Sequence, residues 1–113
     1  MWIDWKSTLS NLRKAGTALA QNNPPVIQAY RGLNEALNEG KALDAKTREL
    51  IALAVAVTTR CDGCISSHSA AARKAGATAE EVAEALGTAI ALNAGAAYVY
   101  STRVMEAFNQ FEE

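Results

Sequence analysis

The stretch ELIALAVAVTTRCDGCISSH, residues 49–68, decides the fold of this chain and carries most of its chemistry. Its first half is almost entirely apolar, and its second half holds the chain's two cysteines, Cys61 and Cys64, and its single histidine, His68. On a helix, where successive residues turn by roughly 100°, Cys64 lies about 60° from Cys61, and His68 falls inside the same narrow arc. The spacing therefore predicts two thiols and an imidazole on one helix face, an arrangement that supports thiol chemistry.

The apolar run from Leu50 to Val57 predicts a buried helix. Its valines and the two threonines that follow also favour a β-strand. Alanines interleave the larger side chains, however, and the segment KTREL leads into the run, so we favour a helix with Asp44 as its N-cap. Because a helix that is apolar on all sides must be covered, we expect it at the centre of the domain or of an interface.

The flanking sequence completes an all-α bundle of about six helices in a single domain spanning residues 1–113. Apolar residues recur at three- and four-residue steps, as Trp2, Trp5, Leu9 and Leu12 do in the first helix. The segments expected to be helical are residues 2–20, 26–38, the run after Asp44, 63–74, the segment from the Thr78 cap to Leu92, and a last helix from Ala96.

Punctuating residues set the predicted boundaries of these helices. The segment Asn22–Pro25 breaks the first helix, since proline cannot donate a backbone N–H. Gly76 is expected to end the fourth helix. Thr78 and Glu81 fit a capping box for the fifth helix, and Asn93–Gly95 predicts a brief interruption before the last one.

Composition narrows the class of protein and its compartment. Half of the 113 residues are hydrophobic but only 6% are aromatic, so alanine-rich helices leave apolar surface that calls for a partner. The net charge of −1 argues against a nucleic-acid partner. We expect no membrane span and no signal peptide, because no apolar run is long enough. In the cytoplasm thus implied, a CxxC pair is redox-active or metal-binding rather than a permanent structural disulfide.

The position of the cysteines at a predicted helix start has chemical consequences. The free amides and dipole of a helix N-terminus stabilise the thiolate, the reactive form of a cysteine. His68 lies one turn after Cys64 and can act on that thiol as a general base, so Cys64 is the predicted attacking thiol and Cys61 the resolving one. The reverse order stays open, since the first cysteine attacks in many CxxC sites.

Glu49 joins this group if the helices on either side of the cysteine turn are antiparallel. Its carboxylate would then lie level with His68, orient the imidazole and stabilise its protonated form. The alternative is an exposed Glu49 that only complements the dipole at the helix start.

Two other interpretations of the cysteines remain. They could be two small buried residues, or they could bind zinc together with His68, which would supply three ligands and need a fourth from Asp62, Glu49 or another subunit. We favour redox chemistry without a metal, and without an organic cofactor, because no glycine-rich phosphate loop is present.

The spacing of Glu49, Cys61, Cys64 and His68 resembles the redox signature of the alkylhydroperoxidase D-like branch of the carboxymuconolactone decarboxylase family: a glutamate, eleven residues, CxxC, three residues and a histidine. The flanking segments LDAKTRELIALAVA and SHSAAARKAGATAEEVAEAL resemble that branch too, and the likeness covers about residues 24–108. It implies an all-helical fold, a homotrimer or homohexamer, Cys61 and Cys64 as the redox pair, and Glu49 and His68 as a proton relay.

The resemblance further implies a hydroperoxide or disulfide substrate, with a peroxiredoxin or thiol reductant as partner. Peroxidase members carry a second histidine between the cysteines, where this chain has Gly63, so either the relay is simpler or the true substrate differs. We therefore predict a thiol-dependent oxidoreductase. The alternatives are a non-enzymatic redox-sensing or interaction subunit, and a lyase or hydrolase that uses Glu49 and His68 as acid and base.

Overall fold

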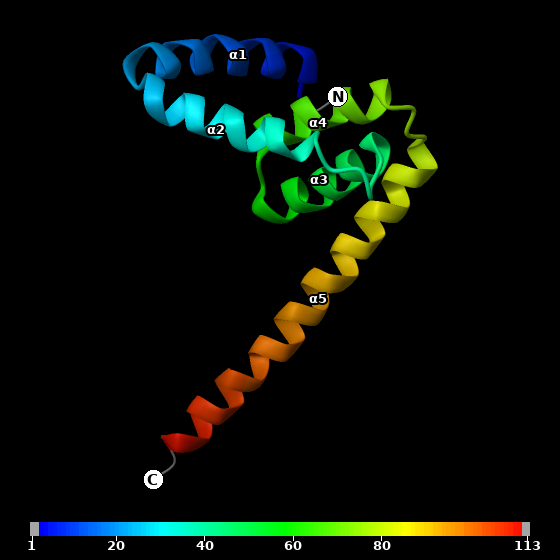
Figure 1. The fold of residues 1–113 in the computed structure, drawn as a ribbon. Coiled ribbons are helices and arrows are strands. Elements are labelled where there is room, and N and C mark those ends of the chain that lie inside the picture. The colour runs from blue at the N-terminus through cyan, green and yellow to red at the C-terminus, as the bar shows by residue number, and fades with distance from the viewer. Residues whose placement is uncertain (1–2, 112–113) are drawn as a thin grey trace.

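In a computed structural model that describes residues 3–111, this part of the chain forms five α-helices joined by short connections (Figure 1). The all-α prediction is confirmed. The start predicted for the first helix, including Trp2, lies outside the described residues. The five helices are α1 (Trp5–Asn22), α2 (Pro24–Leu37), α3 (Ala45–Thr59), α4 (Asp62–Lys74) and α5 (Ala79–Gln110).

The apolar run forms α3, as the helical interpretation predicted. Asp44 caps it, because its side chain accepts a hydrogen bond of 2.8 Å from the backbone N–H of Thr47. The side chain of Thr47 first, and this backbone N–H second, lower the pKa of the Asp44 carboxyl, since they stabilise its charged form. Leu53 and Ala56 are buried where α3 packs against α4 and α5. The helix is central in that it contacts both α4 and α5, but the predicted burial on all sides is not seen within one chain, since Ile51, Val55 and Val57 are 49%, 55% and 42% exposed.

The break between α1 and α2 is narrower than predicted. Asn23 alone leaves the helical conformation, and Pro24 and Pro25 occupy the first turn of α2. Proline is tolerated there because the first N–H groups of a helix have no carbonyl partner within it. α2 packs against α1 and leaves most of its large apolar side chains exposed.

The predicted interruption at Asn93–Gly95 is wrong, and α5 runs unbroken for 32 residues. Asn93 is held within the helix, since its side-chain amide donates to the carbonyl oxygen of Ala89 at 2.7 Å and to Oγ1 of Thr58 at 3.0 Å. The second contact ties α5 to α3. The fifth and sixth predicted helices are therefore one, which leaves five helices in the described residues.

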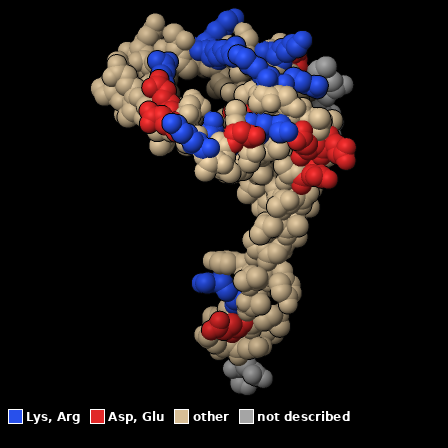
Figure 2. All heavy atoms as spheres, turned by 45° about the vertical axis from the view of Figure 1, so that its right-hand side comes forward, with Lys and Arg blue, Asp and Glu red and all other residues tan. Residues whose placement is uncertain are grey.

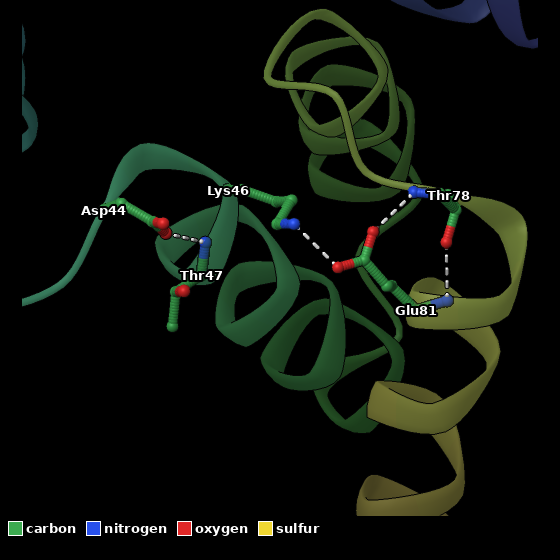
Figure 3. A network of polar contacts seen from close by, with 5 residues as sticks. All are labelled: Asp44, Lys46, Thr47, Thr78 and Glu81. Carbon is green, nitrogen blue, oxygen red and sulfur yellow. Dashed lines mark hydrogen bonds and ion pairs between the residues drawn. The ribbon is translucent and has the colours of Figure 1, made fainter.

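A polar network joins the starts of α3 and α5 (Figure 3). Thr78 Oγ1 accepts from the N–H of Glu81 at 3.1 Å, and Glu81 Oε1 accepts from the N–H of Thr78 at 2.9 Å, which is the predicted capping box. The other carboxylate oxygen of Glu81 lies 2.7 Å from Nζ of Lys46. This lysine first, and Thr78 second, lower the pKa of Glu81. The network fixes how α5 leaves the rest of the molecule.

The second half of α5 projects far from the other helices (Figure 1). The radius of gyration is 18.6 Å, whereas a compact chain of this length has about 13 Å. Charged side chains gather over the other helices and near the tip of α5, while the middle of α5 is uncharged (Figure 2); residues 85–102 contain none. By length and composition, α5 is the one helix of the described part that could cross a membrane, which is weak evidence because a helix buried in an assembly has the same properties.

Candidate active site

A tight turn between α3 and α4 builds the site. Arg60 ends α3 in the left-handed conformation, with φ 56° and ψ 48°, and it is the one non-glycine residue with positive φ in the part of the chain described. The chain thereby reverses within two residues, so that α4 returns alongside α3. The N–H of Cys61 donates to the carbonyl oxygen of Ala56 at 3.1 Å and closes the end of α3.

Cys61 is also the N-cap of α4. Its sulfur accepts a hydrogen bond of 3.1 Å from the backbone N–H of Cys64, in the position where a serine or aspartate oxygen usually serves. Cys64 lies in the first turn of α4, as predicted, whereas Cys61 stands just before the helix rather than on its face. Cys61 therefore joins two helices, through its N–H to α3 and through its sulfur to α4.

The two cysteines form a disulfide across this first turn, with Cα atoms 5.2 Å apart. Both residues are half-buried. The structure therefore shows the oxidised member of the predicted dithiol–disulfide couple.

Glu49 of α3 and His68 of α4 form a pair. Oε2 of Glu49 lies 2.6 Å from Nδ1 of His68, and the two side chains are 24% and 34% exposed. Glu49 thus faces α4 instead of standing free at the helix start. This contact leaves Nε2 as the nitrogen of His68 that is free of the carboxylate. That Glu49 and His68 take part in catalysis stays a prediction.

A pocket of about 430 Å³ brings Cys64 and His68 together. One face of α3 forms its floor, and α4 and the end of α2 with the following loop form its sides; neither Cys61 nor Glu49 lines it. Among the described residues, no hydrogen bond joins His68 directly to either sulfur. The imidazole and Cys64 are neighbours only in the sense that both line this pocket. The lining residues are Leu37, Leu43, Arg48, Ile51, Ala52, Val55, Ala56, Thr59, Cys64 and His68.

Gly63 faces α1 rather than the pocket. A Cβ atom at this position would stand 3.0 Å from Cδ2 and 3.4 Å from Cδ1 of Leu12. The structure thus accounts for glycine in place of the second histidine, because Leu12 occupies the space into which a side chain at residue 63 would extend. Gly63 itself offers no side chain to a proton relay.

The zinc alternative finds no support in residues 3–111, where no three His, Cys, Asp or Glu side chains cluster in a way that could hold a metal ion. With both sulfurs in the disulfide, neither is a thiolate ligand in this state.

Comparison with known proteins places this site in a family. The sequence pattern of the carboxymuconolactone decarboxylase family matches residues 24–107. The chain belongs to the carboxymuconolactone decarboxylase family. The family predicted from the spacing of the cysteines, histidine and glutamate is thereby confirmed.

Similar proteins match between 76% and 96% of the chain. An uncharacterized protein from Haemophilus influenzae is 59% identical over 109 residues, with 96% of each chain covered. The uncharacterized protein 4 in the cox locus of Paracoccus denitrificans is 33% identical over 105 residues, which cover 90% of this chain and 95% of that one. The crystal structure of a carboxymuconolactone decarboxylase family protein from Legionella pneumophila superposes with a TM-score of 0.74 at 33% identity, over 96% of this chain and 97% of that one. A crystal structure from Methanobacterium thermoautotrophicum gives 0.70 at 30% identity, over 76% and 97%.

The sequence interpretation missed the arginine of the pocket, Arg48. It precedes Glu49 directly and shares one face of α3 with Ala52, Val55 and Thr59. This helical spacing was visible in the sequence. It did not indicate a pocket, however, because the pocket forms only when α4 and the loop after α2 pack over this face of α3.

Proposed function

We propose that this protein is a thiol-dependent oxidoreductase of the alkylhydroperoxidase D-like type, which reduces a peroxide or a partner's disulfide through Cys61 and Cys64. One observation carries the proposal: a single, mainly apolar pocket has in its wall both Cys64 of the disulfide and a His68 that is bonded to Glu49. An apolar pocket with few polar groups is typical of sites for small organic substrates.

With a peroxide as substrate, the reduced protein starts the cycle. The thiolate of Cys64 attacks the terminal oxygen of the hydroperoxide; the O–O bond breaks, Cys64 becomes a sulfenic acid, and the departing alkoxide takes a proton from His68 to leave as an alcohol. The thiol of Cys61 then attacks the sulfenic sulfur, which forms the disulfide and releases water. An external dithiol returns two electrons and two protons, and is itself oxidised to a disulfide.

With a partner's disulfide as substrate, Cys64 attacks one sulfur and forms a mixed disulfide, and the other sulfur leaves as a thiolate that is protonated. Cys61 then attacks Cys64, so the protein becomes oxidised and the partner fully reduced. A peroxiredoxin is a partner of this kind, and a dithiol reductant runs the same steps in reverse.

Two contacts support Cys64 as the attacking thiol. Cys64 lines the pocket and Cys61 does not. The sulfur of Cys61 caps α4 outside the pocket wall. It is still close enough to bond to the sulfur of Cys64, as a resolving thiol must be. Glu49 accepts the Nδ1 proton of His68, so Nε2 is the nitrogen that exchanges a proton in the pocket.

Peroxide consumption by the reduced protein tests the proposal. We expect wild type to consume one equivalent of an organic hydroperoxide without a reductant, to lose both thiols, and to turn over when a dithiol is supplied. Cys64→Ser should consume none. Cys61→Ser keeps an oxygen at the N-cap, and it should consume one equivalent and stop at a sulfenic acid that a dimedone probe labels.

Other results would identify the alternatives. Reversible oxidation that changes the oligomer without turnover of peroxide or disulfide would indicate a redox-sensing subunit. Acid–base activity that survives the loss of both cysteines would indicate a lyase or hydrolase built on Glu49 and His68. Either result would reject the oxidoreductase.

We propose further that the chain acts in the cytoplasm as a homotrimer or homohexamer. The extended shape and the exposed apolar side chains of α2 and α5 support self-association, because a lone chain would leave them in water. Residues 85–102 of α5 would then be covered by further copies of the chain rather than by lipid.

A further inference from the structure

Arg48 occupies the end of the pocket where α3 begins. Its Nη1 donates two hydrogen bonds, of 3.0 Å to the carbonyl oxygen of Gly40 and of 2.6 Å to that of Leu43. These bonds hold the loop between α2 and α3, and Leu43 of that loop is itself part of the pocket wall. The guanidinium is therefore fixed in place before any ligand binds.

The remaining donors of this guanidinium have no partner in the described residues. Nε and Nη2 make no hydrogen bond, and no carboxylate forms an ion pair with Arg48 in residues 3–111. Asp44 is near enough for the charge of Arg48 to contribute to its lowered pKa, but its carboxylate is engaged in capping α3. Glu49, the next residue, is engaged with His68.

The pocket therefore has at one end a guanidinium that lacks an ion-pair partner among the described residues, and hydrocarbon along most of its length. Arg48 is half-buried, and the apolar walls around it lower the local dielectric, which strengthens its attraction for an anion. A planar guanidinium matches a carboxylate in geometry as well as in charge.

The distance between this charge and the sulfur limits the ligand. The Glu49–His68 contact sets α4 level with α3 at that point, and Cys64 lies one turn further along the pocket. At about 1.5 Å per residue, the backbones of Arg48 and Cys64 are separated by roughly 7 Å along the helix axes. The guanidinium reaches further from Cys64, because it is bonded to the carbonyl oxygens of Gly40 and Leu43, which precede α3. An extended alkyl chain spans such a separation.

We propose that Arg48 binds the carboxylate of an amphipathic substrate, whose alkyl chain lies along the apolar face of α3 and places the reacting group at Cys64. Arg48 is then a specificity-determining residue that selects organic acids over neutral compounds of the same shape. This proposal deepens the proposed function, because it names the substrate class of the same site.

Protection of Cys64 from alkylation measures this selectivity without any turnover. In the Cys61→Ser background Cys64 is the one remaining thiol, and its rate of reaction with iodoacetamide at pH 7 is followed while octanoate or octanamide is added at constant ionic strength. The two probes differ in charge and hardly in shape. We expect octanoate to protect at a concentration at least about tenfold lower than octanamide, as the loss of a charged hydrogen-bond partner implies.

Arg48→Gln should abolish this preference and leave protection by octanamide within twofold of the parent. Arg48→Lys should retain part of it. Arg73→Gln, which removes an arginine that lines another cavity, should leave the preference unchanged. Equal protection by both probes in the parent would overturn the proposal. An unchanged preference in Arg48→Gln would overturn it too. So would an equal loss of protection by octanoate and by octanamide in that variant, because Arg48 would then only hold the loop in place. A protein that shows the preference and yet fails to reduce peroxides or disulfides would retain this inference and lose the proposed function.

Discussion

The α3–α4 hairpin and the second half of α5 are built on opposite principles. Of the side chains in residues 3–111 that are buried, nearly all lie in the hairpin, and the remaining one, Ala89, lies where α5 still touches α3. Beyond Asn93, α5 packs against no other helix of the chain, and Tyr98 and Phe108 are 77% and 73% exposed. The hairpin that holds the cysteines is supported within one chain, whereas the end of α5 is suited to support from another copy.

The largest effect is expected where the chain lacks support of its own. Val104→Asp places a charge in the apolar stripe of α5, and we expect it to convert a trimer or hexamer into a 12.0 kDa monomer, because a buried unpaired charge is costly. Light scattering after gel filtration measures the mass. Thr102→Asp lies roughly 160° away around the helix and should leave the assembly intact. Equal masses for Val104→Asp and wild type would remove the distinction between the two regions.

The next effect concerns the hairpin itself. Leu53 is 6% exposed between α3, α4 and α5, and Leu53→Ala should lower the free energy of unfolding by about 2–5 kcal/mol, since it leaves a cavity. Leu19 of α1 is 57% exposed, and Leu19→Ala should cost less than about 0.5 kcal/mol. Urea unfolding followed by circular dichroism measures both. Similar losses would mean that the core is not where the buried residues indicate.

A smaller effect is expected where α1 meets the cysteine turn. Gly63→His restores the histidine of the peroxidase members, but its Cβ would crowd the half-exposed side chain of Leu12, so we expect a loss of about 1 kcal/mol in the free energy of unfolding. In a Leu12→Ala background the same change should cost measurably less, and a double-mutant cycle gives the coupling. Strict additivity would show that Leu12 does not restrict residue 63.

The smallest effect concerns the network at the start of α5. Glu81 has a pKa below its usual 4.5 in the folded protein, chiefly because of Lys46, so its contribution to stability is present above about pH 4.5 and is lost as the pH falls through the folded value. Glu81→Gln keeps an N3 acceptor for the cap. It should have a lower urea midpoint than wild type at pH 7, and the gap should narrow as the pH falls below 4.5. A gap that stays the same across this acid range would rule out the ion pair as its source.

Local signals predicted most of the helices correctly. Asp44, Gly76 and the Thr78–Glu81 box mark helix ends through contacts within a few residues, and the structure shows each of them. Asn93 misled the prediction because its side chain finds an acceptor on α3, a contact that no local pattern displays. The boundary after α1 was placed too loosely for a similar reason, since proline breaks the preceding helix and also starts the next.

The candidate site was predictable as far as helical geometry reaches. The spacing of Cys64 and His68 fixed them on one side of α4, and an antiparallel turn was enough to bring Glu49 to the imidazole. Arg48 and Leu12 were out of reach, because what they do depends on the loop after α2 and on the packing of α1. Contacts on one helix, or between two helices joined by a short turn, can be inferred from the sequence, but contacts with segments packed from elsewhere in the chain cannot.

The pH profile of Cys64 alkylation tests the central claim, that His68 activates this thiol with Glu49 behind it. The rate is measured in the Cys61→Ser background with His68 intact, with His68→Gln, and with the neighbouring exposed Ser67→Ala as the matched control. We predict a midpoint below the ~8.5 of an unperturbed thiol in the first and third proteins, and a shift towards that value with a clearly slower reaction at pH 7 in the second. Superimposable profiles for all three proteins would contradict the account.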